Sequence, residues 1–72
     1  MKHQIVGYSR INSLAYITLE VEVSSHWKSQ IFSQDDPDGI ACYDITKEQA
    51  EQIAKVKKLP RHFDYTLEGT QG

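Results

Sequence analysis

The stretch most suggestive of chemistry is "SQDDPDGIACYD", residues 33–44, where three aspartates crowd against a proline and a glycine. A calcium-binding EF-hand loop needs oxygen ligands at positions 1, 3 and 5, glycine at position 6 and glutamate at position 12. If Gly39 takes position 6, position 1 falls on Gln34 and position 12 on Ile45. The anionic first ligand and the bidentate last ligand are therefore both missing.

A β-turn explains the same letters. Asp36 at the first turn position can bond back to the backbone, Pro37 presets φ at the second, and Gly39 suits the fourth. The sequence therefore predicts a turn between two strands. A weak cation site and an acidic docking loop are the alternatives.

The histidines and the cysteine do not have the spacing of a metal site. The potential ligands are His3, His26, Cys42 and His62. A structural zinc site takes about four such ligands, usually in close pairs, and no two of these lie within four residues of each other. A cysteine nucleophile would need a base such as His26 or His62 beside it, and the chain has no glycine-rich phosphate loop. We expect no metal, no cofactor and no catalysis.

A basic segment, "KVKKLPRH" at residues 55–62, offers a binding hypothesis. The residues that would contact phosphates are Lys55, Lys58, Arg61 and His62. Trp27 or Tyr65 would supply a surface on which a base stacks. The net charge of −2 counts against nucleic acid, because such binding rests on excess positive charge. Alternatively, these cations only complement the dipole at a helix C-terminus.

A second binding hypothesis rests on exposed aromatic and acidic side chains. Alternation along residues 14–23 puts Tyr16 on the same solvated face of the strand as Glu20 and Glu22. Exposed Tyr and Trp side chains on a sheet are favoured anchors for protein partners. The candidate partner-binding residues are Tyr16, Glu20, Glu22 and Trp27. Ordinary cross-strand pairing of aromatic residues is the alternative.

The elements that must position these residues follow from the hydrophobic pattern. Residues 14–23, "LAYITLEVEV", alternate with period two and predict a strand with one buried face. Residues 3–8 predict a shorter strand that joins it in a hairpin, because turn formers separate the two. Residues 26–32 are expected to return alongside as a third strand, and residues 40–45 predict a short fourth one.

One helix is predicted before the last strand. Thr46 is a good N-cap, Gln49 completes a capping box, and Pro60 is expected to end the helix near residues 58–59. Residues 62–69 alternate and predict the final strand. The expected core joins Ile17, Leu19 and Val21 to Ile53, Val56, Phe63 and Tyr65.

The order β-β-β-β-α-β predicts an α+β fold. It is a small, mostly antiparallel sheet of four to five strands with one amphipathic helix packed on one face. Residues 1–72 form a single domain, with a loose tail at residues 69–72. A chain this short buries only about 60% of its unfolded surface, so the core is small.

Composition narrows the class of protein. The chain is 39% hydrophobic and 25% charged, which is typical of a globular domain. No apolar run approaches the roughly 18 residues of a membrane span. The N-terminus lacks the apolar core of a signal peptide, and a lone Cys42 forms no internal disulfide, so we expect a cytoplasmic protein without membrane contact.

These observations favour a small non-catalytic module that binds another protein and alters it. Short accessory or inhibitor proteins of bacteria and their phages often have this shape, which is an analogy of size and not of motif. The alternative is a nucleic-acid-binding domain that uses the basic corner at residues 55–62. A self-associating structural subunit is a third possibility.

Overall fold

The computed structural model describes residues 2–70. The elements follow in the order β1 (Lys2–Ser9), β2 (Ala15–Val21), α1 (Ser25–Ile31), β3 (Cys42–Ile45), α2 (Lys47–Ala54) and β4 (Phe63–Thr70). The strands form one sheet in the order β2-β1-β4-β3, and every neighbouring pair is antiparallel. The predicted α+β fold is confirmed, with four strands and with two helices where one was expected.

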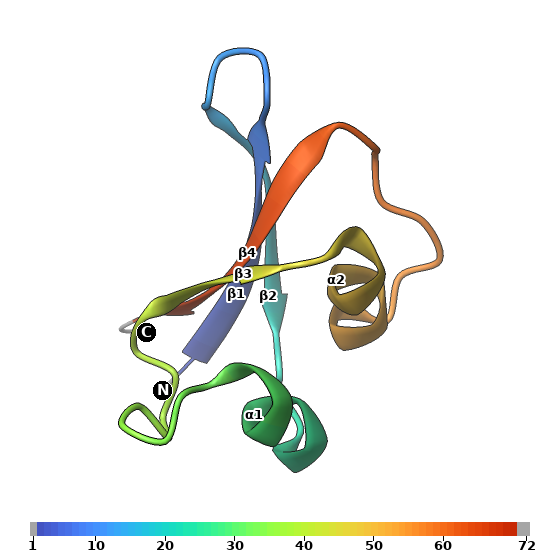
Figure 1. The fold of residues 1–72 in the computed structure, drawn as a ribbon. Helices are drawn as coiled ribbons and strands as arrows, with labels where there is room; N and C mark the ends of the chain where they lie inside the picture. The colour runs from blue at the N-terminus through green and yellow to red at the C-terminus, as the bar shows by residue number, and fades with distance from the viewer. Residues whose placement is uncertain (1, 71–72) are drawn as a thin grey trace.

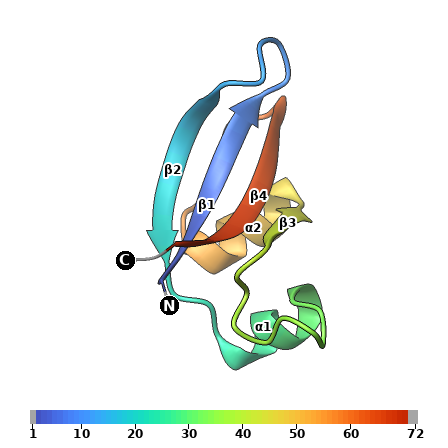
Figure 2. The same cartoon turned by 90° about the vertical axis from the view of Figure 1, so that its left-hand side faces the viewer.

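The molecule has two layers (Figure 1). The helix α2 packs against one face of the sheet, and α1 lies at the lower end of the same layer. Figure 2 looks onto the opposite face, which neither helix covers. We call these the helix side and the open face of the sheet. Among residues 2–70, no helix is long and apolar enough to cross a membrane.

The core lies between the sheet and the helices. Its buried members are Ile5, Phe32, Ile45, Ala50, Ile53, Leu59, Tyr65 and Leu67. The predicted strand residues Ile17, Leu19 and Val21 do pack against this core, but they are only half-buried. Their strand β2 lies at the edge of the sheet, so one flank of each side chain has no neighbouring strand.

Gly7 in β1 lets two larger side chains meet on the helix side. A Cβ atom at this position would lie 3.0 Å from the Cε1 atom of Tyr65 and 3.1 Å from the Cβ atom of Ile17. Both distances are shorter than ordinary van der Waals contact, so a side chain here would require the Tyr65 and Ile17 side chains to shift. Directly beyond Gly7 the pairing of β1 with β2 shifts, because Gly7 pairs with Ile17 but Tyr8 pairs with Ala15.

The prediction of a strand at residues 26–32 is wrong, because most of this segment forms the helix α1. The Ser24 side chain caps the helix by accepting a hydrogen bond from the Trp27 N–H at 3.4 Å. Trp27 and Ile31 are four residues apart, and both are half-buried against the core. Four-residue spacing is typical of a helix, but seven residues contain only one such repeat, which is a weak signal.

The helix α2 begins as predicted and ends early. Thr46 and Gln49 form the full capping box, with the Gln49 N–H 3.0 Å from Thr46 Oγ1 and the Thr46 N–H 2.9 Å from Gln49 Oε1. The helix ends at Ala54, because Lys55 adopts a left-handed conformation with φ 58°. The prediction that it continues to residues 58–59 is therefore wrong.

The early end of α2 changes one core residue. Val56 was expected in the core, but it is exposed, and Leu59 is buried there instead. The Glu51 carboxylate explains the change, since it accepts a hydrogen bond from the Leu59 N–H at 2.6 Å and pairs with Lys47 Nζ at 2.8 Å. The loop after α2 is thus tied back along the helix.

The final strand is as long as predicted but begins and ends one residue later, because β4 runs from Phe63 to Thr70 and not over residues 62–69. Gly69 pairs with His3 and Thr70 pairs with Lys2, so the expectation of a loose tail is wrong for residues 69–70. Residues 71–72 lie outside the described part of the chain. The two central strands, β1 and β4, therefore pair with each other along their whole length without a break.

Candidate functional site

The hairpin between β1 and β2 projects beyond the sheet and ends in a hydrogen-bonded turn (Figures 1 and 2). We call residues 10–14 the hairpin tip. The Ser9 N–H donates to the Leu14 carbonyl at 2.9 Å, and the Ser13 N–H donates to the Ser9 carbonyl at 2.8 Å. Ser13 adopts a left-handed φ of 61° that closes the turn. These bonds fix the backbone of the hairpin tip.

Side chains add further bonds to the same turn. Ser9 Oγ accepts a hydrogen bond from the Ile11 N–H at 3.1 Å, and Asn12 Oδ1 accepts one from the Leu14 N–H, also at 3.1 Å. Asn12 Nδ2 donates to the Tyr16 hydroxyl at 2.7 Å. Short polar side chains that bond to nearby backbone groups are typical of ordered turns.

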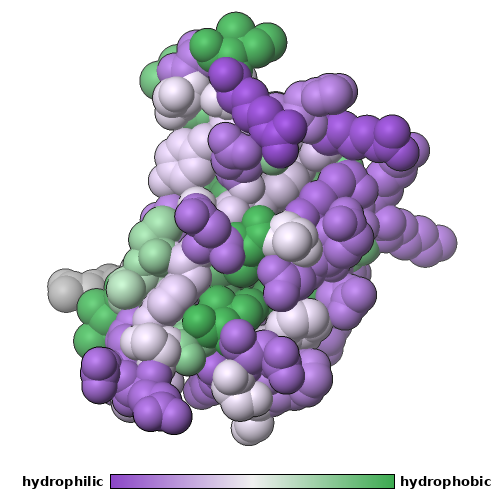
Figure 3. All heavy atoms as spheres, viewed as in Figure 1, coloured by the Kyte–Doolittle hydropathy of each residue, from purple (hydrophilic) through white to green (hydrophobic). Residues whose placement is uncertain are grey.

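Apolar side chains on this rigid turn point into solvent. Ile11 is 96% exposed, Leu14 is 59% exposed, and Tyr16 beside the tip is 60% exposed. Figure 3 shows hydrophobic atoms at the projecting end of the molecule, where the hairpin lies in Figure 1. Exposed apolar groups gathered at one place often mark a surface that binds another molecule. Neither residue was predicted from the sequence as part of a binding site, because Ile11 lies among the turn formers of residues 9–13 and Leu14 begins the alternating pattern of residues 14–23.

Tyr16 does not lie where strict alternation puts it. The pairing shift at Gly7 and Tyr8 leaves Tyr16 as the extra residue of a bulge in β2. Its ring meets the Phe63 ring edge-on, with the centroids 6.4 Å apart and the planes at 82°. Phe63 packs against the core, so Tyr16 reaches toward the helix side, whereas Glu20 stands on the open face. A bulge can redirect one side chain in this way.

The other predicted partner-binding residues lie along β2 and just beyond its end. Glu20 is exposed, with its Oε1 3.8 Å from Lys2 Nζ. Glu22 follows the strand and is exposed. Trp27 on α1 is half-buried and lines a hollow of about 230 Å³ together with Glu22. The four residues therefore follow one edge of the sheet, but they do not share one face.

The basic corner is divided in the structure. Lys55 borders the small hollow beside Trp27, whereas Arg61 and His62 line a different and larger hollow. Lys58 is exposed and lines neither. The predicted phosphate-binding residues thus do not form a single stripe.

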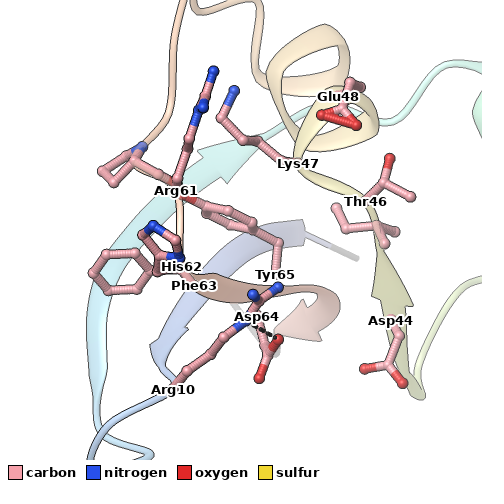
Figure 4. A pocket seen from close by; sticks show the side chains of 12 residues that line it. Arg10, Asp44, Thr46, Lys47, Glu48, Arg61, His62, Phe63, Asp64 and Tyr65 are labelled. Carbon is pink, nitrogen blue, oxygen red and sulfur yellow. Dashed lines mark hydrogen bonds and ion pairs between the residues drawn. The ribbon is translucent and has the colours of Figure 1, made fainter.

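The larger hollow has a volume of about 530 Å³ and is shown in Figure 4. It lies between the end of β3, the start of α2, the loop before β4 and the start of β4. Its charged walls are mixed, with Arg10, Lys47 and Arg61 against Asp44, Glu48 and Asp64. Arg10 already pairs with Asp64 at 3.0 Å, and Lys47 pairs with Glu51. Equal numbers of acids and bases do not favour a polyanion here.

The turn predicted within residues 33–44 is present, but it connects the helix α1 to β3 and not two strands. The Gly39 N–H donates to the Asp36 carbonyl at 3.1 Å. The Asp36 carboxylate accepts from the N–H groups of Ile40 and Ala41, at 2.8 and 2.9 Å, and from the Tyr43 hydroxyl at 2.7 Å. The two backbone bonds are the main reason that the pKa of Asp36 is lowered. Asp36 thus uses its oxygens to shape the loop.

The histidines and the cysteine have separate surroundings. His3 stacks on Phe32, with ring centroids 5.3 Å apart, and its Nε2 lies 3.0 Å from the Asp38 carbonyl oxygen. His26 lies edge-on to Trp27 on α1, and His62 borders the larger hollow. Within residues 2–70, no three His, Cys, Asp or Glu side chains lie close enough together to hold a metal ion.

A polar cluster on the open face centres on Glu68. One carboxylate oxygen, Oε2, accepts hydrogen bonds from the Thr66 hydroxyl at 2.7 Å, the Tyr8 hydroxyl at 2.8 Å and the Cys42 thiol at 3.7 Å. The bond from Thr66 is the main cause of a lowered pKa at Glu68. Burial raises the pKa of the Cys42 thiol, and the Glu68 charge adds to this. Such a thiol is mostly protonated at neutral pH and is a poor nucleophile.

Comparison with known proteins gives no relative from which a function could be transferred. No family model, no curated protein and no solved structure matches the chain.

Proposed function

We propose that the protein is a non-catalytic binding module that docks on a larger protein and inserts its hairpin tip into an apolar cleft there. The observation that carries this proposal is the exposure of Ile11, 96%, at the end of a turn whose backbone is held by hydrogen bonds. An accessory or inhibitory role fits this mode of docking, because an inserted tip would block or reshape the cleft that receives it.

The energetics of the tip favour binding. Fully burying an Ile, Leu or similar side chain contributes roughly 1.5–3 kcal/mol each. Most of the surface of Ile11, Leu14 and Tyr16 is exposed in the free protein, so most of this free energy becomes available when a partner buries them. The turn is already ordered, so little backbone entropy is lost on docking. A convex, rigid, apolar tip therefore suits a concave apolar site on the partner.

The surroundings of the tip provide a polar rim. Arg10 lies at its base, with the side chain about half exposed and paired with Asp64. Asn12 and Ser13 lie between the two apolar residues of the tip. An apolar centre with a polar rim is the usual anatomy of a protein interface.

The experiment compares two exposed isoleucines at different sites. Ile40, 66% exposed, lies in the loop before β3 and serves as the matched control for Ile11. Wild type, Ile11→Ser and Ile40→Ser are immobilised and used to capture the partner from an extract of the cells that make the protein. The captured protein is then purified, and its affinity for each variant is measured by calorimetry. Circular dichroism confirms that each variant is folded.

We expect Ile11→Ser to weaken binding by at least about tenfold, or 1.4 kcal/mol, and Ile40→Ser to bind like wild type. Equal binding by both variants would refute docking through the tip. If Lys58→Ala with Arg61→Ala abolishes binding while Ile11→Ser binds normally, the basic corner is the site. Steep weakening with salt would then point to the nucleic-acid alternative.

A further inference from the structure

The two edges of the sheet differ in how well they are protected. β3 has only four residues, whereas β2 has seven and lies at the free left-hand edge in Figure 2. Natural sheets protect their edges with short strands, lysines, prolines or covering segments, because free backbone groups can pair with another chain. The sequence of β2, "AYITLEV", contains no lysine and no proline, and Glu20 is its one charged residue. Of the two edge strands, β2 is therefore the longer and offers more backbone groups for further pairing.

The two faces of β2 differ in chemistry. On the helix side, Ile17, Leu19 and Val21 are half-buried, so part of each apolar side chain still meets water. On the open face, Thr18 and Glu20 are exposed, and the Glu20 side chain is 74% accessible. A strand added outside β2 would place its own alternating side chains beside these two rows.

We propose that the free edge of β2 takes up an extended segment of a partner protein as a fifth strand, and that this segment alternates apolar with basic side chains. The inference rests on the proposed docking role but concerns a separate surface from the hairpin tip. The apolar side chains of the segment would cover the row from Ile17 to Val21. Its basic side chains would face Glu20, with opposite charges on neighbouring strands.

The far end of β2 extends the same pattern. Beyond Val21 the chain borders the hollow of about 230 Å³ lined by Val23, Trp27 and Ile53, with the charged residues Glu22 and Lys55 at the same hollow. Among residues 2–70, no ion pair includes Glu22. The last apolar side chain of a docked segment would fill this hollow, and a basic neighbour would lie near Glu22.

A second copy of the chain fits this edge less well. Antiparallel pairing of two β2 strands matches the whole apolar row only when Leu19 pairs with Leu19, which puts Ile17 opposite Val21. That register brings the two Glu20 side chains to diagonal positions on the open face, where like charges repel. Glu20 already has Lys2 Nζ at 3.8 Å, but both side chains of this pair are mostly exposed. The carboxylate can therefore still face a basic side chain on an added strand, whereas a second copy would bring a second carboxylate close to it.

The test uses capped seven-residue peptides and the folded full chain. The probe alternates lysine with valine, and its control replaces every lysine with glutamate. In two further probes, N-methyl groups on alternate residues block the backbone N–H groups along one edge of the extended peptide, a different edge in each probe. A third probe is methylated along both edges. Binding is followed by NMR, together with hydrogen exchange of the β2 amide groups.

Strand addition predicts that the lysine–valine peptide slows exchange of alternate β2 amides by at least about tenfold. It also predicts that one of the two peptides methylated along a single edge still binds, because its other edge can pair with β2. The peptide methylated along both edges should not bind. The glutamate peptide should bind at least about tenfold more weakly, and Glu20→Gln should reduce that difference about threefold.

Three results would overturn the inference: equal binding of the lysine and glutamate peptides, protection of β3 in place of β2, or a β2-paired dimer of the free protein in sedimentation experiments. The variant Ile11→Ser separates this inference from the proposed function. It should bind the peptide like wild type, because the hairpin tip does not contact it. If Ile11→Ser loses the protein partner while the peptides fail, docking through the tip stands and strand addition falls.

Discussion

The side-chain amide of Asn12 donates a hydrogen bond to the Tyr16 hydroxyl over 2.7 Å, which ties the hairpin tip to strand β2. The same side chain accepts a hydrogen bond from the Leu14 N–H through Oδ1. Asn12 therefore restrains Leu14 and Tyr16, the two exposed residues that follow it in the chain. A polar residue that makes no contact with a partner can still support binding if it holds the residues that do.

Asn12→Ala tests this restraint. We expect the hydrogen exchange of the Leu14 amide to become about tenfold faster, since its acceptor is lost. Partner binding should weaken about three- to tenfold, because the tip must then be ordered on docking. Tyr16→Phe, which keeps the ring and removes only the hydroxyl, should have a smaller effect on both. Unchanged Leu14 exchange in Asn12→Ala would show that the turn is rigid without this side chain.

Burial predicts a graded series of core substitutions across the sheet. Leu67 in the central strand β4 is fully buried, and Leu67→Ala should cost about 2–5 kcal/mol of unfolding free energy. Leu19 in the edge strand is half-buried, so Leu19→Ala should cost only about 1–2 kcal/mol. Thr18→Ala, on the exposed face, should change stability by less than about 0.5 kcal/mol.

Urea titrations followed by circular dichroism measure all three. A larger loss for Leu19→Ala than for Leu67→Ala would contradict the strand order, because it would place β2 in the centre of the sheet.

The sequence predicted the parts of the fold in which one pattern extends over enough residues. Alternation in residues 14–23 and 62–69 identified two strands and their buried faces. The capping box at Thr46 identified the start of α2. In each case the local chemistry and the tertiary environment favour the same structure.

The errors arose where local signals were short or where tertiary contacts decided the outcome. The helix α1 contains a single four-residue repeat, from Trp27 to Ile31. Residues four apart share a face in a strand as well as in a helix, so this repeat does not distinguish the two. The end of α2 depends on Glu51, whose carboxylate reaches forward to the Leu59 N–H. No propensity of the intervening residues encodes that bond.

The candidate site was predicted in part, for similar reasons. Alternation identified Glu20 as exposed on the open face, and the structure places it there. It could not reveal the bulge that turns Tyr16, because the bulge depends on pairing with Gly7 and Tyr8 in another strand. Ile11 was missed because its exposure depends on how far the hairpin projects beyond the sheet.

Asp36 should be important for stability, and its neighbour Asp35 should not. Asp36→Asn replaces a carboxylate whose two oxygens accept hydrogen bonds from two backbone N–H groups and from Tyr43. An amide has only one accepting oxygen, so the melting temperature of this variant should fall. Asp35→Asn serves as the control, and calcium at millimolar concentration should leave both variants unchanged. A calcium-dependent rise in the wild-type melting temperature, absent from Asp36→Asn, would instead support a cation site.

The Asp36 contribution should depend on pH. Hydrogen bonds to the Ala41 and Ile40 N–H groups lower the pKa of Asp36 in the folded state. A lowered folded pKa adds stability that is fully present above the unfolded value, near 3.9, and is lost as pH falls through the folded pKa. The stability difference between wild type and Asp36→Asn should therefore shrink in acid, as thermal melts between pH 7 and pH 2 would show.

The surface thiol of Cys42 should react slowly for an exposed cysteine. Burial of the sulfur is the largest cause of its raised pKa, and the negative charge of Glu68 contributes in the same direction. Less thiolate is then present at pH 7, and the thiolate is the nucleophile. We expect iodoacetamide to alkylate Cys42 more slowly than a cysteine in an unstructured peptide, with the pH–rate profile displaced to higher pH.

Glu68→Gln identifies the contribution of the charge. Glutamine keeps an oxygen that can accept from Thr66 and Tyr8, but it carries no negative charge, so the pKa of Cys42 should fall toward its ordinary value. Alkylation at pH 7 should then become faster, because more of the thiol is present as thiolate. Asp64→Asn removes another carboxylate from the same strand, away from the thiol, and should leave the rate unchanged. Equal acceleration by both variants would mean that loss of the overall negative charge, and not the Glu68–Cys42 contact, governs the reactivity of the thiol.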